Sequence, residues 1–69
     1  MEHTYRNITE LLGPKLTRQF LDIATEESLW IWFNKPNKVF DNQTPYEVVL
    51  NNRNKIEELM YYFKNSVLN

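Results

Sequence analysis

Residues 32–50 decide the fold, and they read WFNKPNKVFDNQTPYEVVL. The clearest local signal in the chain lies at the end of this stretch. Thr44 suits the N-cap of a helix, Pro45 suits the first helical position, and the side chain of Glu47 can reach back to the cap. The pattern therefore predicts a capping box at Thr44 and a helix that runs through Leu50.

Two turns precede this helix. Residues 34–38 form the first, because the proline within them disfavours helix at the residue before it. Val39 and Phe40 are then expected to point back to the core. Residues 41–43 form the second turn, in which Asn42 is the candidate for a positive φ.

An apolar run lies directly before the first turn. Residues 29–33 read LWIWF, and five such side chains cannot share one face of a helix. A β-strand is one alternative, because aromatic and β-branched residues favour strands. However, Thr25 suits an N-cap, and Glu26 and Glu27 suit the first turn of a helix. We therefore expect a helix that ends at Phe33.

The N-terminal third predicts two more short helices. Asn7 is the expected N-cap of a helix that runs through Leu12, and Gly13-Pro14 stops that helix and starts the next. The second helix covers residues 14–23. Its apolar side chains recur on one face: Leu16, Phe20 and Ile23.

Asparagines at positions 51, 52 and 54 predict a break, after which the last helix starts near Asn54 or Lys55. One face of that helix is apolar and carries Ile56, Leu59, Met60, Phe63 and Val67. The opposite face carries Glu57, Glu58, Tyr61, Tyr62 and Lys64. We therefore expect an all-α fold, with residues 1–69 forming a single compact domain of four to five short helices.

The composition leaves little catalytic chemistry. The chain has no cysteine, one glycine and one histidine, His3, which is expected to lie in a frayed N-terminal segment. Thiol chemistry, a metal site and a glycine-rich phosphate loop are therefore not expected. Adjacent carboxylates at 26–27 and 57–58 point about 100° apart on a helix and do not share a site. We expect no enzyme, no cofactor and no metal.

Charge and length favour a protein partner. Eight basic and nine acidic residues provide no field that would attract nucleic acid, which makes nucleic acid an unlikely partner. No apolar run approaches the roughly 20 residues of a membrane span, and the polar start does not resemble a signal peptide, so the expected compartment is the cytoplasm. A core this small rarely supplies more than about 3–5 kcal/mol. A second copy, forming a homodimer, or a different protein is expected to supplement it.

Aromatic residues make up 14% of the chain. Trp30 and Trp32 are expected on different faces of one helix, and Tyr61 and Tyr62 on the outer face of another. Two interpretations stay open: all of these rings belong to the core, or the outward rings form a binding surface, as tryptophan and tyrosine often do.

The central stretch resembles the toxin-binding domain of the Xre/MbcA/ParS-type antitoxins. That family shows a tryptophan followed by a bulky apolar residue, a Pro-Asn turn, another apolar residue, a glycine-rich turn and Thr-Pro at a helix start. The matching residues are Trp32, Phe33, Pro36, Asn37, Phe40, Thr44 and Pro45. The resemblance covers residues 26–64. Asn42 stands in place of the usual glycine, and the residues before Thr25 are too few for the helix–turn–helix half that typical members carry.

The resemblance implies a module that binds a partner toxin and covers its active site; in this family the usual partner is a RES-domain toxin that consumes NAD. By the same analogy, the tail at 65–69 contributes to that contact. The candidate contact residues are Trp30, Trp32, Tyr61, Tyr62 and Lys64, and the residues expected to hold the frame are Pro36, Asn37, Phe40, Thr44 and Pro45. The alternatives are a small phage-type inhibitor of a host defence or CRISPR effector, and a small DNA-binding regulator.

Overall fold

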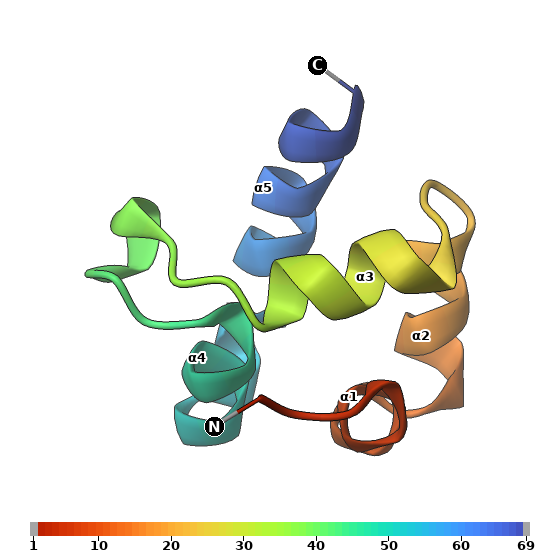
Figure 1. Ribbon diagram of the computed structural model, residues 1–69, viewed down its shortest axis with the longest axis horizontal. Coiled ribbons are helices and arrows are strands. Elements are labelled where there is room, and N and C mark those ends of the chain that lie inside the picture. Colours follow the sequence, from red (N-terminus) through yellow and green to blue (C-terminus); the bar gives the residue numbers. More distant parts are fainter. Residues whose placement is uncertain (1, 69) are drawn as a thin grey trace.

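The chain folds into α-helices joined by short loops and 3-10 turns over residues 2–68, which the computed structural model describes, with side chains as far as Ser66. In chain order the elements are α1 (Tyr5–Leu12), α2 (Pro14–Leu21), α3 (Glu26–Phe33), η1 (Lys38–Phe40), α4 (Pro45–Asn51), η2 (Arg53–Lys55) and α5 (Ile56–Leu68) (Figure 1). Within the described residues there is no strand, and Asn37 and Gln43 form an isolated antiparallel bridge. The predicted all-α fold is confirmed, and residues 26–33 are helix rather than strand.

Threonine side chains begin three of these helices. Thr25 and Thr44 cap α3 and α4 as predicted, each accepting a hydrogen bond from the backbone N–H three residues later. The predicted cap of the first helix is wrong. Thr4, not Asn7, is the N-cap of α1, and its hydroxyl accepts from the amide of Asn7 over 3.1 Å. Thr4 has the extended backbone that a cap requires, whereas Asn7 already lies inside the helix.

Gly13 separates α1 from α2 as predicted, with a positive φ of 84° that favours glycine. The guanidinium of Arg53 donates to the carbonyl of Leu11 over 2.7 Å and so ties this corner to η2. α2 ends at Leu21, two residues before the predicted end. The amide of Ile23 bonds to the carbonyl of Phe20, which tightens the last turn and stops the helix.

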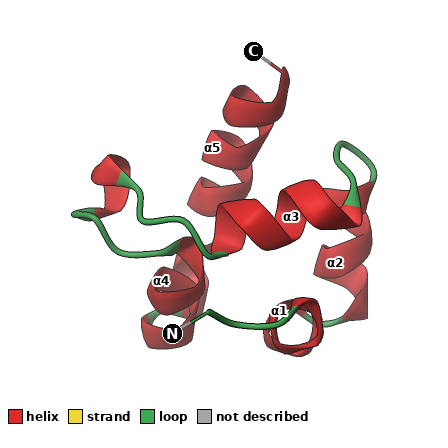
Figure 2. Cartoon of the chain, viewed as in Figure 1, coloured by secondary structure: helices red, strands yellow, loops and turns green. Residues whose placement is uncertain are grey.

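The segment between α3 and α4 is mostly loop (Figure 2). Asn42 has the predicted positive φ, 66°, and Asp41 before it also has one, 56°. Phe40 is buried as expected. Val39 was expected to be buried too, but it is 53% exposed. Both residues lie in η1, a single 3-10 turn in which neighbouring side chains point in different directions, so only Phe40 faces the core.

Aromatic rings meet at the centre of the core. Phe63 of α5 packs edge-on against Phe20 of α2, with ring centroids 5.1 Å apart, and Phe20 packs in the same way against Phe33 of α3 at 5.6 Å. Such edge-to-face pairs add about 0.5–1.5 kcal/mol beyond the area that they bury. α2, α3 and α5 are therefore joined through one aromatic cluster.

α5 begins one residue after the expected start, following η2. Its apolar stripe is confirmed at Ile56, Leu59 and Phe63, which are buried, whereas Val67 lies outside the described side chains. Tyr62 was expected on the exposed face but is half-buried, with its ring edge-on to Phe40 at 5.5 Å. The C-terminal part of α5 extends past α3, on the side away from α4 (Figure 1).

Candidate functional site

The frame residues predicted from the sequence hold the loop and the start of α4. The amide of Thr44 donates to Glu47 Oε1 over 3.0 Å, and Thr44 Oγ1 accepts from the Glu47 amide over 3.2 Å. Pro45 is buried at the first helical position. The predicted capping box is therefore present. These bonds lower the pKa of Glu47, because the Thr44 amide and then its hydroxyl favour the charged carboxylate.

Asn37 fixes the turn before α4. Its side chain accepts from the Val39 amide over 3.0 Å, and its carbonyl accepts from the amides of Phe40 and Asn42. The Asn37 amide donates to the carbonyl of Gln43 over 3.1 Å. The two ends of the loop are thus bonded to each other, so the residues on its outer side are held in place.

The N-terminal segment is fixed rather than frayed. The backbone of His3 is bonded twice by the amide side chain of Asn34, at 2.7 and 2.9 Å, and its carbonyl also accepts from Trp30 Nε1. The His3 ring stacks on Tyr46 with centroids 3.6 Å apart. The Trp30 side chain therefore bonds within the fold, and His3 is attached to both α3 and α4.

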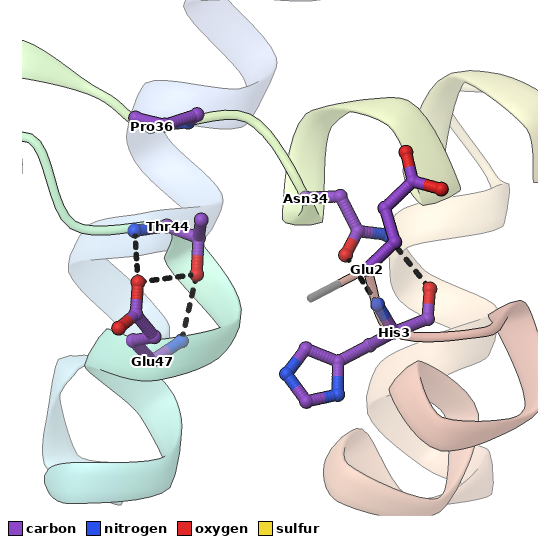
Figure 3. Close-up of a pocket in the computed structure, with 6 residues that line it drawn as sticks. All are labelled: Glu2, His3, Asn34, Pro36, Thr44 and Glu47. Atoms are coloured by element: carbon purple, nitrogen blue, oxygen red, sulfur yellow. Dashed lines mark hydrogen bonds between the residues drawn. The ribbon is translucent and has the colours of Figure 1, made fainter.

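One pocket, of about 470 Å³, opens beside this segment. Its lining residues are Glu2, His3, Asn34, Pro36, Thr44 and Glu47, drawn in Figure 3. Thr44 and Glu47 come from one side and His3 and Asn34 from the other (Figure 3). The Thr44 hydroxyl and the Glu47 carboxylate hydrogen-bond to each other over 3.0 Å as part of the capping box. These polar atoms are therefore already hydrogen-bonded in the N-terminal cap of α4.

A second pocket, of about 460 Å³, lies on the other side of Pro36, between the loop and the end of α5. It is lined by Trp32, Lys35, Pro36, Asn37, Lys38 and Ser66, and we call it the Trp32 cleft. Trp32 is half-buried, with its ring edge-on to Phe63 at 5.0 Å. Lys35 and Lys38 are exposed, and neither forms an ion pair with a described residue.

The structure separates the predicted contact residues. Trp32 lines the cleft, and Tyr62 lies one helical turn before Ser66 on the same side of α5. Tyr61 is 64% exposed and touches the Tyr62 ring edge-on. Tyr61 lies about 140° around the helix axis from Ser66, and neither it nor Trp30 nor Lys64 lines the cleft. Trp30 faces the N-terminal segment, as its bond to the His3 carbonyl requires.

Lys64 lies away from the cleft. It lies two positions before Ser66, which places the two side chains about 160° apart around the helix axis. Ser66 belongs to the tail at 65–69 that the resemblance implied as a contact, and it lines the cleft, whereas the side chains of 67–69 lie outside the described residues. Lys35 and Lys38 also line the cleft, but they were not among the predicted contact residues. The two lysines flank the Pro-Asn turn at 36–37, which was a usable signal.

Comparison with protein-family models, with curated proteins and with solved structures found no match to this chain. The resemblance to the antitoxin module therefore stays a prediction. Among the described residues, no three metal-binding side chains gather, and no helix is both long and apolar enough to cross a bilayer.

Proposed function

We propose that this chain is a non-catalytic protein-binding module that neutralises a toxin-like enzyme by covering its active site. The observation that carries the proposal is the Trp32 cleft, where an aromatic ring and two exposed lysines surround a hollow beside a fixed loop. Large aromatic side chains at a concave site are typical of binding hot spots.

Two further features support a docking role. The loop is fixed through Asn37 and the capping box at Thr44, so binding needs little ordering of the backbone. Tyr62, one helical turn before Ser66, adds a half-buried aromatic ring on the side of α5 that faces the cleft. The resemblance of residues 26–64 to an antitoxin module supplies the proposed class of partner, a RES-domain enzyme in the first instance.

The test begins with the complex. The tagged chain is purified from its native host, the co-purifying enzyme is identified, and its activity is titrated with the pure chain. We expect inhibition that is complete near one equivalent per active site. Hydrogen exchange on the complex should show protection at Trp32, the 35–38 loop and Tyr62, and none specific to Lys64.

Variants add an independent readout. Trp32→Leu removes the ring that lines the cleft and should weaken inhibition at least about fivefold, since truncating a contact aromatic commonly costs about 1 kcal/mol or more. Urea unfolding verifies that the variant remains folded. Lys64→Ala is the matched control and should leave inhibition unchanged. An enzyme that binds without losing activity, or protection confined to the Lys64 side of α5, contradicts the proposal. Recovery of a nuclease or CRISPR component as the inhibited enzyme would replace the toxin with the defence-inhibitor alternative.

A further inference from the structure

The two pockets beside Pro36 carry opposite charges. The pocket at the N-terminal segment is lined by Glu2 and Glu47, whereas the Trp32 cleft is lined by Lys35 and Lys38 and, among the described residues, by no carboxylate. Pro36 lines both and marks the border between them. A negatively charged group is therefore attracted to the Trp32 cleft and repelled from its neighbour.

The lysines of the cleft are available to a partner. The ion pairs among the described residues are Arg6 with Glu10 and Lys55 with Glu58, each between close neighbours in the sequence. Neither Lys35 nor Lys38 pairs with a carboxylate of the described residues. Their backbone is fixed, since the Lys35 amide bonds to the Trp32 carbonyl at the end of α3 and Lys38 follows the bonded Asn37.

We infer that the Trp32 cleft binds an acidic segment of the partner protein, with carboxylates at Lys35 and Lys38 and an apolar side chain against the Trp32 ring. This inference rests on the proposed function and names the chemistry of the surface that the module recognises. Carboxylate–lysine pairs set the position of the segment, and the burial of an apolar side chain on Trp32 and Pro36 supplies affinity.

A protein segment fits these observations better than nucleic acid. A polyanion is bound by a row of cations along its backbone, whereas the cleft offers two lysines on a chain whose net charge is −1. The acidic first turn of α3 in a second copy, Glu26 and Glu27, has the required charge and is exposed. Self-association through that turn is therefore a competing outcome of the test.

The experiment uses the full chain labelled with ¹⁵N and three capped hexapeptides. The first contains four glutamates around Leu-Phe, the second replaces the glutamates with glutamines, and the third replaces them with lysines. We expect the acidic peptide to shift the Trp32 indole signal and the amides of 35–38 saturably, with the Trp30 indole as an internal control. Added salt should weaken this binding.

A charge-reversed variant supplies the matched comparison. Lys35→Glu combined with Lys38→Glu should weaken binding of the acidic peptide at least about fivefold, because two partly exposed ion pairs are lost. Lys64→Glu makes the same kind of charge change about 160° away on α5 and should alter the affinity by less than about twofold. Circular dichroism and urea unfolding verify that the variants remain folded.

Several results would overturn the inference. If the glutamine peptide binds as tightly as the acidic peptide, charge does not contribute to the affinity. If binding of the acidic peptide does not saturate by about 5 mM, the cleft is not a binding site for such a segment. Tighter binding of duplex DNA at the same amides assigns the cleft to nucleic acid. If the wild type dimerises and the Lys35→Glu, Lys38→Glu variant does not, the cleft binds a second copy of the chain.

The inference and the proposed function fail separately. If the Lys35→Glu, Lys38→Glu variant still binds and inhibits the enzyme as well as the wild type does, the proposed function stands and the acidic segment is ruled out. If the acidic peptide binds saturably at the cleft but no partner enzyme is inhibited, the inference stands and the proposed function fails.

Discussion

The indole N–H of Trp30 donates a hydrogen bond to the backbone carbonyl of His3 over 2.9 Å, joining the middle of α3 to the N-terminal segment. Asn34, one turn later, donates to the same carbonyl and to the carbonyl of Trp30. One tryptophan and one asparagine thus attach residues before α1 to a helix far along the chain. A tryptophan selected from the sequence as a partner contact has a structural role.

Trp30→Phe removes this donor while keeping an aromatic ring. We expect the free energy of unfolding to fall by about 1 kcal/mol, the net contribution of a hydrogen bond of this kind. Urea denaturation measures the change. Amide exchange of His3 should accelerate more than that of the α5 core amides, because the segment is released locally. Equal acceleration in both places would contradict the local role of the bond.

Thr44→Ala tests the capping box. The variant loses the acceptor for the Glu47 amide and should be less stable by about 1 kcal/mol in urea unfolding. Thr44→Ser keeps the hydroxyl and is the matched control, with an expected change below about 0.5 kcal/mol. If serine and alanine destabilise equally, the loss comes from the threonine methyl group rather than from the cap.

Glu47 makes the cap dependent on pH. Its pKa is lowered in the folded chain by the Thr44 amide and hydroxyl, so its contribution to stability is fully present above the ordinary glutamate pKa of about 4.3. That contribution is lost as the pH falls from there through the lowered pKa. Urea midpoints measured from about pH 7 to pH 3 should therefore fall less steeply for Glu47→Gln than for the wild type. Parallel curves would rule out this role of the carboxylate.

Asn42 tests the left-handed turn. At a φ of 66° a β-branched side chain is strained, so Asn42→Val should lower the free energy of unfolding by about 1–2 kcal/mol. Asn42→Gly, which fits the same backbone, should change it by less than about 1 kcal/mol. Thermal or urea unfolding of the pair measures the difference. A valine variant as stable as the glycine variant would contradict the strain.

Local signals were predictable from the sequence, and long-range ones were not. The caps at Thr25 and Thr44 depend on atoms three residues apart, so the pattern specifies them. Thr4 at α1 has the same spacing, because its hydroxyl accepts from the amide of Asn7, and sequence reasoning overlooked it. The bonds that fix the backbone of His3 come instead from a distant helix. Sequence spacing contains no information on that contact.

The candidate site shows the same limit. Trp32 and Tyr62 were selected because of their side chains, but the lysines beside Trp32 become part of a cleft only because Ser66 of α5 lies across from them. That meeting depends on the direction of α5 relative to the loop, which no periodicity specifies. For the same reason, Trp30 and Lys64 could not be separated from the other contact residues in advance.

The two neighbours of Tyr62 on α5 should behave very differently when truncated. Phe63 is fully buried and packs against the rings of both Phe20 and Trp32, so Phe63→Ala removes about 3–5 kcal/mol. A core of this size supplies about that much in total, so the variant should lose its cooperative unfolding transition. Tyr61 is mostly exposed, and Tyr61→Ala should stay within about 0.5 kcal/mol of the wild type. Urea and thermal unfolding of the pair check both expectations. A folded Phe63→Ala variant would show that the stability of the chain does not depend on this aromatic cluster, whereas an unfolded Tyr61→Ala variant would show that the Tyr61 ring supports the core despite its exposure.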